Sequence, residues 1–531
     1  MEEFLNKDVL MDSFPFEFRG NQAWTMEQIA IAINKPEIKY IVLQAPTGSG
    51  KSPIAIALAE AATDAYILTS NKILQDQYVR DFDELIADMR GRSNYKCLKS
   101  RGYDCSNAPC RVDKALRKVC SQEKACEYHL ALSTAGAAKI TSFNFAAAIS
   151  FLNHTQNFKP RKILIVDEAH LIQDNLTNFI EFSISGDQID KWSLLGHGAC
   201  TIPVHETALE YLDWLKMILA NAIVREENFD GPSRVDVMIG NDITFDKLEQ
   251  LVRKLKTIVG EIEAYGDNLV VDPVYTDEHK IAISKISFKP LDVSRYAEEK
   301  LFQFGEKTIL MSATIINYTE FIKSVGIKPE DCAFIDVPST FPKDNRPILK
   351  QYVGTLNYKN MQGSMPLIIE RVADILRNHS KEKGIIHTHS YDTAKKLSVA
   401  LQKEFGQRIL FPEKSWKQAE ILAQHAASKI PTVLMSPSMT EGVDLKDDLS
   451  RFQIIVKVPY PSLGDKIVAA RMKRNEHWYG WKTLLTVIQA YGRSTRSETD
   501  YSVTYVLDGA FEQLIMRYRK SLPSWFTDAI L

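Results

Sequence analysis

The sequence predicts an α/β protein with two parallel-sheet domains, a cysteine-rich insertion and a mostly helical insertion. Three observations lead to this prediction: continuous apolar runs of strand length, helical periodicity between those runs, and five cysteines gathered in one short stretch. Apolar runs of about four to eight residues without polar alternation are typical of parallel strands buried on both faces. With 531 residues, the chain is long enough for roughly three or four domains with buried cores.

The composition is that of a globular protein, with 45% hydrophobic and 25% charged residues. The 65 Lys and Arg residues are balanced by 67 Asp and Glu residues, so a surface for nucleic acid must be local. No apolar run reaches the roughly 18 residues that suggest a membrane-spanning helix, and the acidic N-terminus does not resemble a signal peptide. We therefore expect a cytoplasmic protein with no membrane partner.

The predicted strands fall into two groups, which a long helical segment separates. The runs of the first group are Tyr40–Gln44, Ala65–Ser70 and Lys162–Asp167. Those of the second group are Lys383–His389, Thr432–Ser436, Gln453–Val458 and Ser502–Asp508. Between the groups, residues 209–224 and 245–266 have apolar residues at helical spacing, which predicts a mostly helical insertion over residues 180–300.

A glycine-rich loop follows the first predicted strand directly. Ala45–Ser52 reads APTGSGKS and opens a helical pattern, which is the strand–loop–helix context of a phosphate-binding loop. Backbone amides of such a loop turn toward phosphate oxygens, and the helix N-terminus adds partial positive charge. We expect Lys51 to reach the β- and γ-phosphates of ATP and the Ser52 hydroxyl to ligate Mg²⁺. The predicted nucleotide contacts in the loop are Ala45, Thr47, Gly48, Ser49, Gly50, Lys51 and Ser52.

A carboxylate pair ends the third predicted strand, where Asp167 and Glu168 begin the tetrapeptide DEAH. Asp167 is placed to hold the Mg²⁺ shell, and Glu168 to orient or deprotonate the attacking water. Alone, such a pair is more often part of a solvated loop. Together with the phosphate-binding loop, it predicts ATP hydrolysis.

These two segments and five others resemble the motifs of superfamily 2 helicases, in the order that this family has them. The five others are Phe18–Gln22, Thr69–Gln77, Ser312–Thr314, Ser438–Asp444 and Gln489–Arg496. The resemblance implies two RecA-like motor domains and adenine recognition by Gln22. It also implies that residues 69–77 contact the phosphates of a single strand and that residues 312–314 couple hydrolysis to strand movement. It adds Glu441 and Asp444 to the nucleotide contacts, and Gln489, Arg493 and Arg496 to the catalytic residues.

The two arginines lie in the second predicted sheet domain, whereas Lys51 and Glu168 lie in the first. An arginine aimed at the γ-phosphoryl group stabilises the negative charge that spreads over its oxygens in the transition state. We therefore expect Arg493 and Arg496 to complete the site only when the two domains close on ATP.

Five of the seven cysteines lie within one stretch: Cys97, Cys105, Cys110, Cys120 and Cys126. Gly91–Cys97 resembles the GRxNYxC segment that begins the iron–sulfur domain of XPD/DinG-type helicases, and Cys126–His129 resembles its end, with Glu127 in place of Pro. The resemblance implies that four of the five thiolates hold a [4Fe–4S] cluster.

The spacing does not choose the four ligands, because Cys120 with Cys126 resembles the DinG pattern while Cys105 with Cys110 suits the XPD pattern. A zinc site and uncoordinated thiols are the alternatives to a cluster. From Arg90 to Lys124 there are ten Lys and Arg residues against three Asp and Glu, a local positive charge suited to a single-strand backbone.

The motifs divide the chain into six segments. They are 1–94 and 131–179 (first RecA-like motor domain), 95–130 (iron–sulfur domain), 180–300 (helical, Arch-like insertion), 301–335 (end of the first motor domain and linker) and 336–531 (second RecA-like motor domain).

The resemblance implies an ATP-dependent DNA helicase, acting as a monomer, that uses ATP and Mg²⁺ to move along single-stranded DNA and unwind forked duplex in the 5′→3′ direction. A translocase that displaces proteins without unwinding, an RNA-directed helicase and a nucleotide-controlled switch remain as alternatives. The sequence identifies no protein partner, and it leaves open a role in DNA repair or replication.

Overall fold

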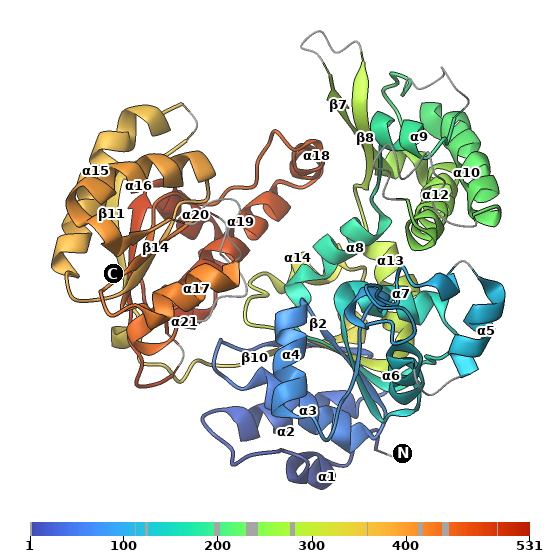
Figure 1. The fold of residues 1–531 in the computed structure, drawn as a ribbon. Helices are drawn as coiled ribbons and strands as arrows, with labels where there is room; N and C mark the ends of the chain where they lie inside the picture. Colours follow the sequence, from blue (N-terminus) through green and yellow to red (C-terminus); the bar gives the residue numbers. More distant parts are fainter. Residues whose placement is uncertain are drawn as a thin grey trace.

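The computed structural model describes residues 3–111, 113–122, 126–195, 202–229, 243–276, 282–357, 359–411, 418–437, 445–495 and 497–531. These residues form two lobes built on parallel sheets and a smaller antiparallel unit, which projects from the first lobe (Figure 1). The predicted parallel-sheet α/β architecture is confirmed. Within the described part of the chain, no helix is both long and apolar enough to cross a membrane.

The first lobe is built on a seven-stranded parallel sheet with the order β10-β1-β9-β5-β2-β4-β3. Its strands are β1 (Tyr40–Gln44), β2 (Ala65–Thr69), β3 (Ala87–Met89), β4 (Ile140–Asn144), β5 (Arg161–Val166), β9 (Gly305–Ser312) and β10 (Cys332–Asp336). Every residue of β1 and β2 is buried, as expected for central strands that helices cover on both faces.

The helices of this part of the chain precede or connect these strands. They are α1 (Lys7–Asp12), α2 (Gln22–Ile33), α3 (Lys51–Ala62), α4 (Lys72–Asp81), α5 (Lys114–Gln122), α6 (Glu127–Ala137), α7 (Phe145–His154), α8 (Ile172–Ile180), α13 (Ser294–Lys300) and α14 (Tyr318–Ser324). In the register of the sheet, Gln44 pairs with Ser312, and Val166 pairs with Leu310. The carboxyl ends of β1, β5 and β9 therefore meet at one edge, where ligands of open α/β sheets bind.

The second lobe contains a six-stranded parallel sheet with the order β11-β16-β15-β12-β14-β13. Its strands are β11 (Ile348–Gly354), β12 (Gly384–His387), β13 (Ile409–Leu410), β14 (Val433–Ser436), β15 (Phe452–Ile455) and β16 (Val503–Asp508). Its helices are α15 (Met361–Asn378), α16 (Tyr391–Phe405), α17 (Gln418–Ala427), α18 (Lys466–Arg474), α19 (Glu476–Tyr491), α20 (Ala510–Tyr518) and α21 (Ser524–Thr527). Gly384 is required by packing, since a Cβ there would lie 2.5 Å from the ring of Phe452.

The antiparallel unit contains more strand than the sequence predicts. Its helices α9 (Gly186–Lys191), α10 (Leu212–Glu227) and α12 (Phe245–Tyr265) pack on a sheet of β6 (Phe182–Ser185), β8 (Ile283–Pro290) and β7 (Leu269–Tyr275). The prediction of a mostly helical insertion missed this sheet. The edge strand β7 carries Asp272 and Pro273, which are more typical of a turn than of a strand, and Pro is tolerated there because the strand lies at an edge.

Helix α19 of the second lobe docks against the first lobe. The indole of Trp478 donates to Gln173 Oε1 at 2.8 Å, and the indole of Trp481 donates to the carbonyl of Ile315 at 2.9 Å. Lys482 adds an ion pair with Asp174 at 2.8 Å. Because both indoles are buried and hydrogen-bonded, this interface fixes α19 beside α8 and the end of β9.

Candidate active site

The glycine-rich loop joins β1 to α3 at the carboxyl edge of the first sheet. Gly48 and Gly50 both have φ of 82°, in the left-handed region that side chains disfavour. A Cβ on Gly50 would lie 2.1 Å from Gln22 Nε2. The loop therefore needs glycine for its backbone conformation, and at Gly50 also for the close approach of Gln22.

Gln22, the predicted adenine reader, contacts this loop directly. Its amide nitrogen donates to the carbonyl of Ser49 at 3.1 Å, and its amide oxygen accepts from the backbone of Arg19 at 2.8 Å. A cavity beside it is lined by the loop, the segment around Phe16 and the interlobe linker at Phe341. Aromatic residues and the amide of Gln22 therefore lie next to the glycine-rich loop.

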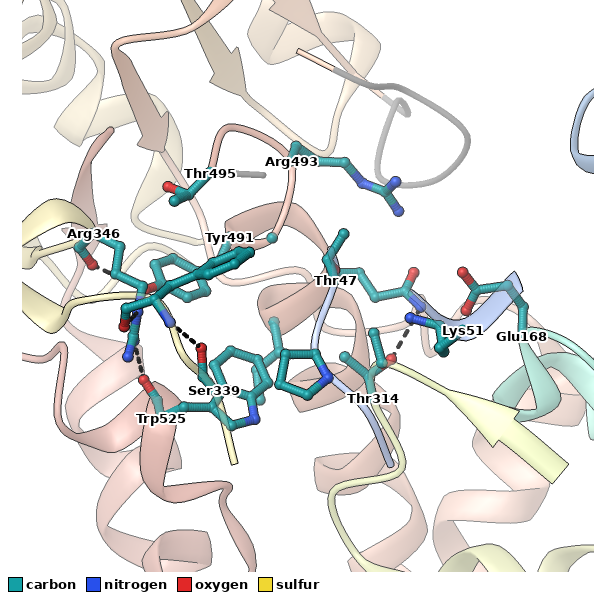
Figure 2. Close-up of a pocket in the computed structure, with 16 residues that line it drawn as sticks. Thr47, Lys51, Glu168, Thr314, Ser339, Arg346, Tyr491, Arg493, Thr495 and Trp525 are labelled. Atoms are coloured by element: carbon teal, nitrogen blue, oxygen red, sulfur yellow. Dashed lines mark hydrogen bonds between the residues drawn. The ribbon is translucent and has the colours of Figure 1, made fainter. Parts of the chain in front are cut away.

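A second cavity lies between the lobes, and residues from both sheets line it (Figure 2). Lys51 and Glu168 come from the first lobe, and Arg493 extends over them from the second. Lys51 Nζ donates to the carbonyl of Ala45 at 3.1 Å. The structure thus brings together three of the predicted catalytic residues across the lobe boundary.

Asp167 is buried and held at both carboxylate oxygens. Oδ1 accepts from the backbone N–H of Glu168 at 2.9 Å, and Oδ2 accepts from the hydroxyl of Tyr78 at 3.0 Å. Burial and the neighbouring charge of Glu168 raise the pKa of Asp167 to about 6. Burial raises the pKa of this phenol, and the nearby side chain of Ser52 lowers it, so both predicted Mg²⁺ ligands lie beside Tyr78. Tyr78 is not among the residues predicted from the sequence.

Glu168 has a different environment, although it is the next residue. Burial alone would raise the pKa of Glu168, but His170, Lys51 and Arg493 together lower it to about 2. Its Oε2 lies 3.3 Å from His170 Nδ1. Glu168 has φ of 52°, and this turn directs its side chain away from that of Asp167 and into the interlobe cavity. At neutral pH it is therefore a carboxylate, the form that accepts a proton or orients a water.

His170 connects this site to the second lobe. Its Nε2 lies 2.5 Å from the amide nitrogen of Gln489 on α19, and its Nδ1 lies 2.9 Å from Ser312 Oγ. Gln489 also donates to Thr314 Oγ1 at 3.2 Å. Two of the predicted helicase segments in the first lobe and one in the second thus meet in one buried network.

Three predicted site residues, Glu441, Asp444 and Arg496, lie outside the described residues. Thr495, the described neighbour of Arg496, lines the interlobe cavity. The cavity also contains Arg346, which the sequence analysis did not single out. Its guanidinium donates to the carbonyl of Phe341 at 3.2 Å and reaches the hydroxyl of Tyr491 at 3.4 Å, so it joins the linker to α19.

All five clustered cysteines line a single cavity, together with Arg92, Tyr128 and His129. The first two cysteines lie on a turn closed by backbone hydrogen bonds: Cys97 N donates to Tyr103 O at 3.0 Å, and Cys105 N donates to Tyr95 O at 2.8 Å. Cys110, Cys120 and Cys126 follow in the short helix Pro109–Arg111, in α5 and at the start of α6. The fold therefore gathers thiols that are spread over 30 positions of the chain.

The thiols lie close enough to interact in pairs. Burial and the neighbouring Cys126 raise the pKa of Cys105 to about 12, and burial and Cys110 raise the pKa of Cys120 to about 11. Across the described ranges, no three His, Cys, Asp or Glu side chains converge on the position of one metal ion. Because all five thiols line the cavity, the choice of four ligands stays open.

Two family profiles match the chain. One, described as a helicase C-terminal domain, matches residues 373–529, and the other, described as the res subunit of type III restriction enzymes, matches residues 15–194. The first covers most of the second lobe, and the second covers the glycine-rich loop, the cysteines and the DEAH segment.

Related sequences and folds agree with these profiles. The Haemophilus influenzae protein "ATP-dependent DNA helicase YoaA" is 21% identical over 337 residues, which cover 59% of this chain and 50% of that protein. A structure described as "XPD_Helicase" superposes with a TM-score of 0.63 at 15% identity, covering 94% of this chain and 97% of the other. The sequence is therefore similar to sequences named as ATP-dependent DNA helicases, and the fold is that of the XPD structure.

Two further matches agree with this similarity in sequence and in fold. "ATP-dependent DNA helicase CHL1" of Scheffersomyces stipitis is 25% identical over 289 residues, which cover 46% of this chain and 34% of that protein. A structure of S. tokodaii Xpd4 has a TM-score of 0.59 at 15% identity and covers 96% of this chain and 99% of the other. The matched regions span half or less of these curated relatives, and the structural matches establish the shared fold.

The raised pKa of Asp167 predicts a pH limit for Mg²⁺ binding. Only the ionised carboxylate binds the cation, so protonation below the pKa of about 6 should weaken Mg²⁺ affinity about tenfold per pH unit, with little change above neutrality. Mg²⁺ titrations that follow a fluorescent ADP analogue between about pH 5 and pH 8 measure this. Asp167→Asn is the control and should show weak affinity without this pH step; a wild-type affinity that stays constant across the range would contradict the assignment.

Proposed function

We propose that this chain is the ATP-hydrolysing motor of a DNA helicase. The observation that carries the proposal is the interlobe cavity, which Lys51 and Glu168 line from the first lobe and Arg493 lines from the second. Lys51, Arg493 and the Glu168 carboxylate, which face a shared space, suit the binding and cleavage of a triphosphate. Ser52 and Asp167, which accepts a hydrogen bond from Tyr78, would hold the Mg²⁺ that neutralises phosphate charge.

Each residue then has a defined part in hydrolysis. Glu168, ionised at neutral pH, orients the attacking water and accepts its proton. Lys51 and Arg493 offset the charge on the γ-phosphoryl oxygens. Because Arg493 belongs to the second lobe, its contribution requires the lobes to be closed, and release of phosphate removes the anion that holds it. Gln489 and His170 would transmit that change across the boundary.

We further propose that the moving lobes act on single-stranded DNA. Asn71 and Lys72 begin α4 at the exposed edge of the first lobe, and the basic cysteine segment lies next to them. Positive side chains beside a strand path supply the backbone attraction that sequence-independent binding needs. Unwinding of a forked duplex in the 5′→3′ direction, by a monomer, rests on the resemblance to XPD/DinG-type helicases.

The cysteine segment fits a [4Fe–4S] cluster by its donor chemistry. Five thiols line one cavity, and a cubane cluster takes four thiolates, one for each iron. Four of Cys97, Cys105, Cys110, Cys120 and Cys126 would hold it, and the bound cluster would cross-link the segment covalently. The residues around the cavity would hold the basic segment in position beside α4.

Removal of Lys51 should stop hydrolysis, and removal of Arg493 should slow it strongly. Lys51→Ala should abolish DNA-stimulated ATPase activity while single-strand binding largely survives, and Arg493→Ala should lower kcat about 10³-fold, as for arginine fingers. The control is Arg377→Ala, which removes an exposed arginine of the second lobe that pairs with Glu404. Steady-state ATPase assays and fluorescence anisotropy with a single-stranded oligonucleotide measure both effects. Full ATPase activity in either cavity variant would refute the site.

Loss of a cluster ligand should separate unwinding from hydrolysis. Anaerobically purified Cys126→Ser should lose iron and visible absorbance, and lose displacement of a strand from a 5′-tailed fork more than ATPase activity. Cys332→Ser, which removes a buried cysteine of β10, is the matched control. It should keep its iron and its strand-displacement activity. Quantitation of iron and zinc shows whether the thiols hold a cluster or a zinc ion. Strand-displacement assays on DNA and RNA forks show which nucleic acid is unwound. A wild-type enzyme that unwinds while free of iron would refute the cluster, and displacement of bound protein without unwinding would favour a translocase.

A further inference from the structure

Helix α4 touches three functional regions at once. Its first residues carry the proposed strand contacts, its buried face reaches the metal-binding carboxylate, and its remaining side holds the start of the cysteine segment. The helix is only ten residues long, so these contacts lie on one short rigid body.

Tyr78 makes the contact with the catalytic carboxylate. Its hydroxyl donates to Asp167 Oδ2 at 3.0 Å, and its side chain is fully buried. Since the other oxygen of Asp167 is held by the backbone of Glu168, the orientation of this carboxylate depends on where α4 places the phenol.

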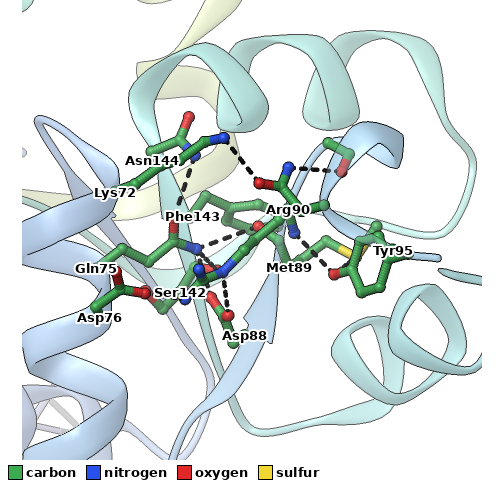
Figure 3. A network of polar contacts seen from close by, with 12 residues as sticks. Lys72, Gln75, Asp76, Asp88, Met89, Arg90, Tyr95, Ser142, Phe143 and Asn144 are labelled. Carbon is green, nitrogen blue, oxygen red and sulfur yellow. Dashed lines mark hydrogen bonds and ion pairs between the residues drawn. The ribbon is translucent and has the colours of Figure 1, made fainter. Parts of the chain in front are cut away.

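Gln75, one turn earlier, anchors α4 to the neighbouring sheet edge (Figure 3). Its amide nitrogen donates to Asp88 Oδ1 at 2.5 Å and to the carbonyl of Met89 at 3.2 Å, and its amide oxygen accepts from Asn144 Nδ2 at 3.2 Å. Gln75 is completely buried. A buried amide whose nitrogen and oxygen are both hydrogen-bonded is held in one orientation. A shift of α4 would therefore move the ends of β3 and β4 as well.

The cysteine segment is attached to the exposed side of the same helix (Figure 3). Lys72 Nζ donates to Asn94 Oδ1 at 2.7 Å, and the Arg90 guanidinium pairs with Asp76 at 2.5 Å. The backbone of Arg90 in turn donates to the hydroxyl of Tyr95, at 3.1 Å, just before Cys97. Displacement of this segment is therefore transmitted to α4.

We infer that Tyr78 is a positioning residue, which orients Asp167 for Mg²⁺ according to the position of α4. The inference rests on the proposed ATPase function. A strand bound at Asn71 and Lys72, or a change in the cysteine segment, acts on α4, and the phenol passes this displacement to the carboxylate. Tyr78 itself does not contact the phosphates; it acts through Asp167.

Tyr78→Phe isolates the hydroxyl, because the ring still fills its buried site. Removal of a hydrogen-bond partner of a metal ligand typically costs about tenfold to 100-fold in metal affinity or activity. We therefore expect the Mg²⁺ concentration for half-maximal ATPase to rise about tenfold and the stimulation by single-stranded DNA to fall. Mg²⁺ titrations of ATPase activity, with and without a single-stranded oligonucleotide, measure both.

Tyr66→Phe is the matched control in the same lobe. Tyr66 is also buried, and its hydroxyl donates to the carbonyl of Lys159 at 2.8 Å, away from the nucleotide site. This variant should keep the wild-type Mg²⁺ dependence and stimulation. Equal losses in the two variants would overturn the inference, as would a Tyr78→Phe enzyme with wild-type Mg²⁺ dependence.

A double-mutant cycle on nucleotide binding tests the route through Asp167 without relying on turnover. Binding of Mg²⁺·ADP is compared in wild type, Tyr78→Phe, Asp167→Ala and the double variant. If Tyr78 acts through Asp167, its replacement has no further effect once Asp167 is gone, whereas additive losses would overturn the inference. A wild-type chain that binds Mg²⁺·ADP but hydrolyses no ATP would defeat the proposed function while leaving this cycle decisive.

Discussion

Lys51 and Arg493 come from different lobes and face the same cavity, and the proposed closure of the lobes depends on this pair. Both side chains are cations, so an anion between them attracts both, and the Glu168 carboxylate lines the same cavity. A triphosphate carries the additional negative charge and would draw both cations toward it. Part of the binding free energy of the nucleotide would thereby stabilise the closed arrangement of the two lobes. Neither lobe alone provides both cations.

The remaining contacts connect that force to the rest of the molecule. On the second lobe, Gln489 and the two buried indoles of α19 hold the helix against α8 and the end of β9. On the first lobe, Asp167 is tied through Tyr78 to α4, and α4 is tied through Gln75 and Lys72 to the cysteine segment. The proposed nucleotide site thus lies at the junction of two hydrogen-bonded networks, one through α19 and one through α4.

Much of this fold follows from local sequence patterns, and the misses have physical causes. The strand Tyr40–Gln44 and the loop after it were predicted because a buried parallel strand and a phosphate loop each have a strong local signature. Strand β7 was missed because an edge strand tolerates Asp272 and Pro273. Tyr78 was missed because its partner Asp167 lies 89 positions away in the sequence. An aromatic residue in a helical pattern is usually interpreted as a core residue, and only the packing of α4 shows its contact with Asp167. The cysteine spacing left the cluster ligands open, and the fold does too, since all five thiols line one cavity.

The distance between the lobes is the most direct measure of whether the nucleotide draws them together. Fluorescent labels at Val9 and Val399, exposed positions on the first and second lobes, report this distance in single molecules by energy transfer. A non-hydrolysable ATP analogue with Mg²⁺ should shift the population to a shorter separation, and Arg493→Ala should prevent the shift. An identical distribution of separations with and without the nucleotide, in a protein that still hydrolyses ATP, would contradict a motor that works by closure of its lobes.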